Sequence, residues 1–211
     1  MFANRSDAGR ELAGLLTGIG PPEDVIVLAL PRGGVPVAFE IARALGAALD
    51  VFVVRKLGTP GHEELAMGAI ASGGIIVLND EVVHSLGIRP EHIDAVARRE
   101  QAELERRNAS YRGNRPLPSL TNRTVILVDD GLATGSTMKA AVQAVKQQHP
   151  ARVIVAVPVG APDTCRALSA IADQVICAQT PTSFSAVGQW YRDFSQTSDD
   201  EVIALLSSRP T

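Results

Sequence analysis

The sequence predicts an α/β fold in which a parallel sheet is flanked by helices. Short, continuous apolar runs recur along the 211 residues, and such runs are typical of strands buried on both faces. Segments with helical spacing lie between most of these runs, and strands that alternate with helices indicate a parallel sheet with right-handed crossovers. The length suits one domain with a sizeable core.

The N-terminal half begins this alternation and then departs from it. We expect a strand over 25–30, a helix over 35–45 that stops at Gly46, a buried strand over 51–54, a long loop or a short excursion over 55–74, and a strand over 75–78. Pro90 then opens a strongly charged helix that runs to about Ser110. A thin apolar stripe follows this helix and consists of Ile93, Val96, Ala97 and Leu104. The helix therefore suits a surface cover, with an oligomer contact as the alternative.

The C-terminal half returns to the alternation after a linker over 112–122 that is rich in Pro, Gly and Asn. The expected elements are a strand over 125–128, a helix over 137–148, a strand over 153–157, a helix over 162–171 and a strand over 174–178. Gly-rich turns follow the first strand and the strand that ends at Val128. Because ligands of parallel sheets bind beyond the carboxyl ends of the strands, these two turns mark the expected site.

Composition and charge argue against several classes of protein. The net charge of −3 and the pI of about 5.8, without a dense Lys/Arg cluster, disfavour a nucleic-acid-binding surface. Cys165 and Cys177 lie outside any CxxC pattern, which indicates buried thiols in a reducing cytosol. No apolar run reaches membrane-spanning length, and the first residues show no apolar leader. We therefore expect a cytoplasmic protein.

Residues 125–137 carry the strongest functional signal. The apolar run ends on two adjacent carboxylates, Asp129 and Asp130, and a turn rich in Gly and hydroxyl residues follows. Glycines let backbone N–H groups approach phosphate oxygens, and a helix N-terminus adds partial positive charge. The two acids would repel that phosphate, but they suit sugar hydroxyls or a metal ion beside it. A plain strand–turn–helix capped by Ser136 or Thr137 is the alternative, and it leaves both acids unexplained.

This stretch closely resembles the motif that binds 5-phosphoribosyl 1-pyrophosphate (PRPP) in type I phosphoribosyltransferases. It differs from a Walker A loop because no lysine follows Gly135. The resemblance implies a Rossmann-like sheet with a small hood. It assigns the ribose hydroxyls to Asp129 and Asp130, and we expect Asp130 to lie nearest the charge that develops at ribose C1. It assigns the 5′-phosphate to Gly131, Leu132, Ala133, Thr134, Gly135, Ser136 and Thr137.

A second turn, Pro31-Arg32-Gly33-Gly34, resembles the pyrophosphate loop of bacterial xanthine–guanine phosphoribosyltransferases. The resemblance assigns the pyrophosphate of PRPP to Arg32 and the amides of Gly33 and Gly34. It also implies a cis peptide bond between Pro31 and Arg32. Arginine suits this role because its planar guanidinium meets phosphate oxygens bidentately. A plain tight turn is the alternative.

Further catalytic groups are expected after the strand over 51–54, where related enzymes place basic residues. Arg55 and Lys56 would neutralise the leaving pyrophosphate. Residues 57–74 take the position of the family's mobile catalytic loop, and their Gly, Pro and polar content suits a lid that excludes water. His62 is either a proton donor or pyrophosphate contact in this loop, or a solvated residue.

The segment after the last strand resembles the base-stacking segment of 6-oxopurine phosphoribosyltransferases. Phe184 would stack on the base, with Val159 also at the base site. Three further aromatic residues either add to this site or pack the C-terminal helix onto the sheet, namely Trp190, Tyr191 and Phe194. The 6-oxopurine enzymes carry a lysine after the preceding strand, whereas this chain has Pro158-Val159-Gly160. Such a polar contact carries much of the base discrimination, so the acceptor base stays open.

The resemblance as a whole implies transfer of a 5-phosphoribosyl group from PRPP to a nitrogenous base, as in nucleotide salvage, with release of pyrophosphate. Mg²⁺ would arrive with PRPP, because the motif offers few ligands beyond Asp129 and Asp130. The alternatives are a PRPP-binding regulator without transferase activity and a hydrolase of PRPP or ribose phosphate. A homodimer is left open. We expect one domain with a core over about 20–72 and 120–178, an inserted segment over about 79–120, and a hood from 1–19 and 179–211.

Overall fold

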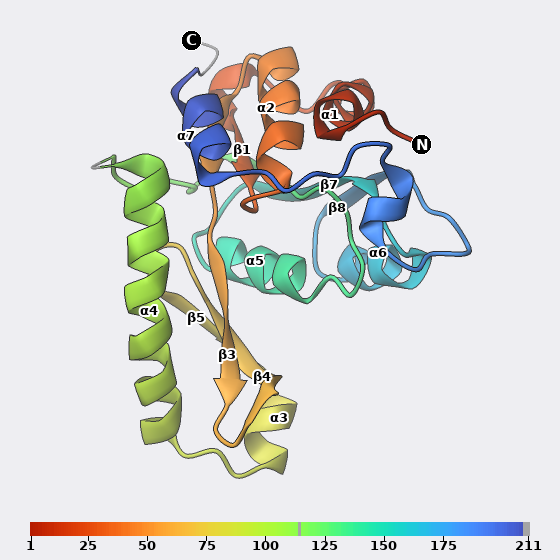
Figure 1. Cartoon of the computed structure of the whole chain (residues 1–211). Coiled ribbons are helices and arrows are strands. Elements are labelled where there is room, and N and C mark those ends of the chain that lie inside the picture. The colour runs from red at the N-terminus through yellow and green to blue at the C-terminus, as the bar shows by residue number, and fades with distance from the viewer. Residues whose placement is uncertain (114, 209–211) are drawn as a thin grey trace.

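A five-stranded parallel sheet lies at the centre of the protein in this computed structural model, which describes residues 1–113 and 115–208 (Figure 1). The strand order is β2-β1-β6-β7-β8. The bounds are Val25–Ala29 for β1, Ala48–Val51 for β2, Thr124–Val128 for β6, Arg152–Val159 for β7 and Gln174–Gln179 for β8. The predicted fold class is confirmed, and the nearly continuous burial of β1, β6 and β7 explains their apolar sequences.

Helices cover both faces of this sheet. One face packs against α1 (Arg5–Ala13), α2 (Gly34–Leu45) and α7 (Asp199–Ser207), and the other packs against α5 (Ser136–Lys146) and α6 (Pro162–Ser169). Side chains of β1 alternate between the two cores, with Val27 on the first face and Ile26 and Leu28 on the second. Among the helices of the described ranges, none has both the length and the apolar character needed to cross a membrane.

The apolar run over 51–54 is not one strand, contrary to the prediction. β2 ends at Val51, and a new strand, β3 (Val54–Thr59), begins at Val54 in a different sheet. Phe52 and Val53 connect the two sheets and are both 2% exposed. The run is apolar throughout because the connection itself crosses the core.

The predicted loop over 55–74 is also wrong, because most of it forms an antiparallel hairpin. β3 pairs with β4 (His62–Ala71), and β5 (Ile75–Leu78) adds a third strand on the far side of β4. The strand predicted at 75–78 therefore exists, but it belongs to this small antiparallel sheet. Gly68 is needed for close strand approach, since a Cβ there would collide with the carbonyl oxygen of Val77.

A long helix, α4 (Pro90–Arg112), runs along the small sheet, and the two together form an arm that extends from the body (Figure 1). A short helix, α3 (Asp80–Ser85), joins β5 to α4. The predicted stripe is confirmed, with Ile93, Ala97 and Leu104 buried. An ion pair four residues apart also lies along the helix, with Arg107 Nε 2.8 Å from Glu103 Oε1.

The arm is tied to the body by a buried ion pair. Arg112 Nε lies 2.9 Å from Asp50 Oδ1, and these side chains are 3% and 8% exposed. Arg112 also donates to the carbonyl oxygen of Val51 and to Asn108 Oδ1. The end of α4 is therefore fixed to β2, close to the carboxyl edge of the parallel sheet.

Candidate active site

The carboxyl ends of β1 and β6 bring the two Gly-rich turns together. These strands pair in register from Val25 with Thr124 to Ala29 with Val128, so the turns that follow them are neighbours. Gly33 lies so close to Asp130 that a Cβ on Gly33 would collide with Asp130 Oδ2. The peptide bond between Pro31 and Arg32 is cis, as predicted. The expected pyrophosphate turn and the expected ribose acids therefore share one site.

The two acids differ in their surroundings. Arg5 Nε donates to Asp130 Oδ2 at 2.8 Å, and these side chains are only 12% and 15% exposed. Asp129 Oδ1 instead accepts a hydrogen bond from the backbone N–H of Asp130 at 2.8 Å. Burial raises the pKa of Asp129 well above its ordinary value, and the adjacent charge of Asp130 adds to this effect. Burial also raises the pKa of Asp130, against the opposing influence of Arg5.

The Asp129 carboxylate is consequently expected to destabilise the free protein at neutral pH. A carboxyl whose pKa is raised on folding stabilises the folded protein most when the pH is below its unfolded pKa, near 3.8. This stabilisation is lost as the pH rises through the pKa of the folded state. D129N should therefore raise the melting temperature at pH 7 and bring no gain at pH 3. Thermal unfolding at both pH values checks this. An equal shift at the two pH values would contradict the electrostatic cause.

Arg5 and Tyr191 belong to the site, although no local sequence motif marks Arg5. Tyr191 Oη donates to the carbonyl oxygen of Asp130 at 2.6 Å. The Arg5 guanidinium lies 4.0 Å from the ring centroid of Phe194. Phe2 forms a backbone bridge with Tyr191, which joins the N-terminal segment to residues 187–195 above the acids. The aromatic residues thus hold the N-terminal segment against residues 187–195, and we call these two segments the cover. The alternative, that they pack the C-terminal helix onto the sheet, is not what the structure shows.

The expected 5′-phosphate loop presents its polar groups outward. Ala133, Thr134, Ser136 and Thr137 are exposed, and Gly135, with a φ of 69°, leads into α5. Lys139 N–H makes the first intrahelical bond, to the Gly135 carbonyl oxygen at 2.8 Å. The preceding N–H groups of α5 have no partner within the helix and are available to an anion.

Leu132 and Gly131 differ from the rest of that loop. Leu132 is 2% exposed, and its N–H donates to the carbonyl oxygen of Val159 at 2.9 Å. This bond anchors the loop to the end of β7, so the expected phosphate contact from Leu132 is replaced by a structural one. Gly131 packs under Val187 and Val159, where a side chain would collide with the Val187 methyl groups.

The two basic residues of β3 face opposite sides of the strand. Arg55 Nη2 lies 2.7 Å from Glu100 Oε2 of α4, so this guanidinium is paired within the arm and does not line the cavity that Lys56 lines. Lys56 instead lines a cavity of about 810 Å³ between the arm and α5. The same cavity is lined by Thr134, Ser136, Thr137 and Lys139. Lys56 therefore faces the phosphate loop, with Glu64 at 3.6 Å as its ion-pair partner.

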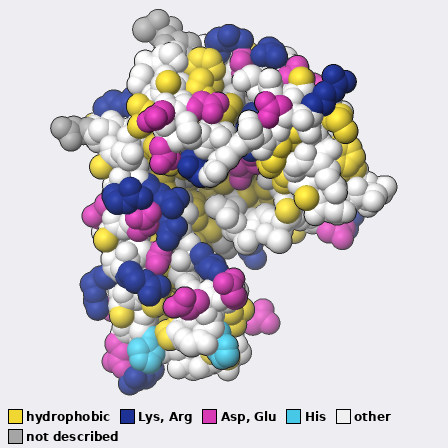
Figure 2. All heavy atoms as spheres, viewed as in Figure 1, with side chains coloured by type: hydrophobic (Ala, Val, Ile, Leu, Met, Phe, Trp, Pro, Cys, Tyr) yellow, Lys and Arg dark blue, Asp and Glu magenta, His cyan; other side chains and the backbone are white. Residues whose placement is uncertain are grey.

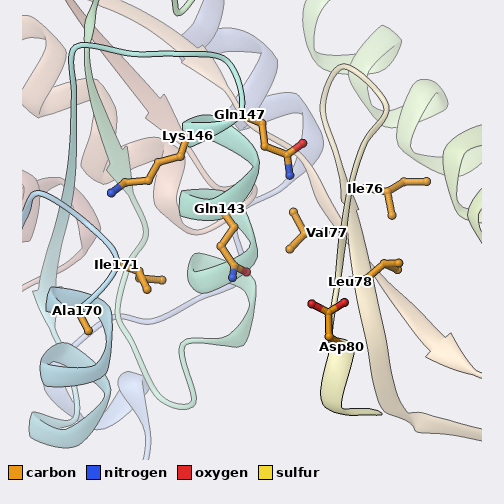
Figure 3. A pocket seen from close by; sticks show the side chains of 9 residues that line it. All are labelled: Ile76, Val77, Leu78, Asp80, Gln143, Lys146, Gln147, Ala170 and Ile171. Atoms are coloured by element: carbon orange, nitrogen blue, oxygen red, sulfur yellow. The ribbon is translucent and has the colours of Figure 1, made fainter. Parts of the chain in front are cut away.

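An open groove of about 560 Å³ adjoins this cavity between β5 and α5. Figure 3 shows Val77 pointing toward α5, whereas Ile76 and Leu78 project from the opposite face of the strand. Gln143 and Gln147 supply polar groups from α5. The groove shares Val77, Leu78, Asp80 and Gln143 with the larger cavity. It extends the phosphate end of the site away from the two acids.

The residues expected at the base site differ in their exposure. Phe184 is half-buried and packs against an apolar cluster that contains Phe2, Val159 and Tyr191. Val159 is fully buried, and its backbone carbonyl oxygen accepts the hydrogen bond from the Leu132 N–H. His62 is exposed at the start of β4, on the hairpin tip.

Comparison with known proteins agrees with this arrangement. The family described as "Phosphoribosyl transferase domain" matches residues 6–195, a range that contains both turns and both acids. The chain belongs to the phosphoribosyltransferase family. The Rossmann-like sheet and its small companion sheet are therefore those of a phosphoribosyltransferase fold.

Several relatives support this membership. Two Mycobacterium tuberculosis proteins, from strains CDC 1551 / Oshkosh and ATCC 25618 / H37Rv, are provisionally named phosphoribosyl transferases, and each is 50% identical over 206 residues. The match covers 98% of this chain and 46% of each relative, so the chain spans about half their length. The crystal structure of TT1426 from Thermus thermophilus is 43% identical, with a TM-score of 0.87 over 97% of both chains. AQ2163 from Aquifex aeolicus, 14% identical, has a TM-score of 0.52 over 87% of this chain and 78% of its own, a likeness of fold alone.

Proposed function

We propose that this member of the phosphoribosyltransferase family transfers the 5-phosphoribosyl group of PRPP to a nitrogenous base and releases pyrophosphate. The convergence of three groups at one sheet edge carries the proposal: the loop over 133–137, the acids Asp129 and Asp130, and the turn at Gly33 and Gly34. PRPP presents a 5′-phosphate, ribose hydroxyls and a diphosphate in the same order. Each part of the donor would thus meet a group suited to bind it.

In the proposed reaction a nitrogen of the base bonds to ribose C1 while the bond from C1 to the diphosphate oxygen breaks. Such a centre passes through an oxocarbenium-like state, as in glycoside cleavage. Asp129 and Asp130 are the acids that would face the developing positive charge, and Arg5 at 2.8 Å from Asp130 favours the ionised form of that carboxyl. We keep Asp130 as the acid that would lie nearest to C1. Lys56 and the N-terminus of α5 would hold the 5′-phosphate.

The residues present fit a Mg²⁺ ion that enters with PRPP. Across residues 1–113 and 115–208, no group of three or more His, Cys, Asp or Glu side chains is placed to hold a metal ion by itself. Asp129 and Asp130 offer carboxylate oxygens, and Mg²⁺ completes its shell with waters and substrate phosphates. When bound, the ion would neutralise charge on the diphosphate and so assist its departure.

The acceptor base stays undefined within this proposal. Phe184 is the aromatic candidate for stacking, and it lies on the segment that also carries Val187 above Gly131. Pro158-Val159-Gly160 provides no lysine for an exocyclic oxygen of a 6-oxopurine. Base discrimination must therefore come from other groups.

We expect the hairpin to act as a lid, as proposed for residues 57–74, although it is a strand pair. Its tip lies beyond Thr59, and Lys56 on β3 faces the phosphate loop across the cavity. PRPP with Mg²⁺ should slow amide hydrogen exchange over 57–64, because closure would order the exposed tip. β8 serves as an internal control that should not change. Equal exchange of the tip with and without bound PRPP would argue against closure.

Incubation of the protein with PRPP, Mg²⁺ and a pool of nitrogenous bases, followed by mass spectrometry, tests the proposed function. We expect loss of one base, appearance of its ribonucleoside 5′-monophosphate and an equal amount of pyrophosphate. Pyrophosphate release without any base would indicate the hydrolase instead. Saturable PRPP binding without turnover in the presence of every base would indicate the regulator.

A further inference from the structure

A small cavity lies where the last turns of α4 meet the pyrophosphate turn and the start of α7. It measures about 150 Å³ and is lined by Arg32, Arg106, Arg107, Ser110, Tyr111 and Asp199. The α4 residues share one side of that helix because positions three and four apart are neighbours. Figure 2 shows basic side chains gathered along α4, beside the hollow between the arm and the body. The cavity therefore joins the arm to the turn already assigned to pyrophosphate.

Positive charge exceeds negative charge around this cavity. Glu103 accepts hydrogen bonds from Arg106 and Arg107, both at 2.8 Å, and these two arginines lower the pKa of Glu103 to about 2. Arg32 Nη1 lies 3.7 Å from Asp199 Oδ1. Three guanidinium groups thus face two carboxylates, and the cluster keeps an excess of one positive charge.

Asp199 is the carboxylate that lies between Tyr111 and Arg32. Tyr111 Oη donates to Asp199 Oδ1 at 2.7 Å, and the same oxygen is the one nearest Arg32. The Asp199 side chain is 57% exposed, and its separation from Arg32 exceeds hydrogen-bond length. An anion with several oxygens could therefore replace this carboxylate at both partners without moving the backbone.

The size and shape of the cavity favour an inorganic anion. Pockets that enclose drug-sized ligands measure roughly 300–1,000 Å³, so a volume of about 150 Å³ is too small for a nucleotide. Guanidinium groups bind phosphate oxygens through paired N–H donors, and Tyr111 and Ser110 add hydroxyl donors.

We propose that Arg106, Arg107 and Tyr111 of α4 complete, together with Arg32, a binding site for the diphosphate group that PRPP carries and the reaction releases. This inference rests on the proposed function and extends its pyrophosphate site from the turn at 31–34 onto the arm. The guanidinium groups stabilise the negative charge that forms on the departing diphosphate. Asp199 returns to Arg32 and Tyr111 once the product leaves, which favours release.

Calorimetric titration of the full chain with inorganic pyrophosphate tests this site without any need for turnover. R106Q/R107Q should bind pyrophosphate about tenfold or more weakly than the unmodified protein, because charge-assisted hydrogen bonds are lost. R98Q removes an exposed arginine of the same helix that does not line the cavity, and it should bind as the unmodified protein does. D199N should bind more tightly, because it removes the competing carboxylate. A purely structural role for Asp199 predicts no such gain.

Titrations with PRPP and with ribose 5-phosphate test whether the site binds the diphosphate group of the donor. PRPP affinity should fall in R106Q/R107Q in proportion to that of pyrophosphate, whereas ribose 5-phosphate affinity should not change. R106K/R107K, which keeps both charges, should recover part of the loss and so exclude misfolding as its cause.

Equal pyrophosphate affinity in R106Q/R107Q and R98Q would overturn the inference. Weaker pyrophosphate binding with unchanged PRPP binding would also overturn it, by showing an anion site separate from the donor. Absence of transfer to any base, with these affinity changes intact, would count against the proposed function alone.

Discussion

D129N/D130N is expected to lower PRPP-dependent pyrophosphate release by about 100-fold or more, the usual cost of removing preorganised transition-state stabilisation. Amides keep the shape of both side chains but remove the negative charge that would face the developing positive charge at C1. They also bind the ribose hydroxyls more weakly, since a neutral acceptor forms weaker hydrogen bonds than a carboxylate. The measurement is initial rate against PRPP concentration with the acceptor base held saturating.

Stability of the same variant shows whether the loss is chemical. Neutralising the two acids should not destabilise the protein at pH 7, because burial raises the pKa of both carboxyls despite the ion pair between Asp130 and Arg5. The melting temperature at pH 7 should therefore not fall below that of the unmodified protein. Retained pyrophosphate release by a folded D129N/D130N would exclude both acids from the reaction.

R112M is expected to destabilise the protein by about 3–5 kcal/mol, because it leaves the Asp50 carboxylate buried without its cation. For a chain of this size the melting temperature should fall by about 10 °C. The variant also frees the end of α4 from β2, so pyrophosphate affinity should fall as Arg106 and Arg107 lose their fixed position. Thermal unfolding and calorimetry on one sample measure both effects.

R98M and D50N/R112M are the matched controls for this prediction. R98M places the same side chain at an exposed position of α4 and should change stability little. D50N/R112M should lose less than R112M, because the buried charge is removed along with its partner. A melting temperature of R112M equal to that of R98M would show that the ion pair does not hold the arm.

The central sheet could be predicted because parallel strands covered on both faces have continuous apolar sequences. β1, β6 and β7 are of this kind, and the glycine that ends α2, Gly46 with a φ of 62°, is also visible in the sequence. The same criterion failed at 51–54, where an apolar connection between two sheets has the composition of a strand.

The hairpin could not be predicted from composition. Glycines such as Gly68 indicate a loop when read alone, yet here they permit close strand approach. The polar residues of β4 reflect its exposed first half, from His62 to Leu65. Without the positions of α4 and α5, the sequence does not show which face of the hairpin is covered.

Some residues of the candidate site could likewise be predicted from the sequence, and others could not. Asp129, Asp130 and the loop after them are contiguous in the sequence, so a short motif is enough to predict that they lie together. Arg5 meets Asp130 across 125 residues of sequence, and no local pattern marks such a contact. Arg55 and Lys56 are adjacent basic residues, and only the alternation of side chains along β3 separates the structural residue from the one that lines the cavity.

A crystal structure of the protein with PRPP and Mg²⁺ tests the central claim most directly. We predict the 5′-phosphate on the backbone N–H groups at the start of α5, the ribose hydroxyls beside Asp129 and Asp130, and the diphosphate between the turn at 31–34 and the arginines of α4. PRPP bound at another part of the surface, or a diphosphate directed away from Arg32, would contradict this assignment.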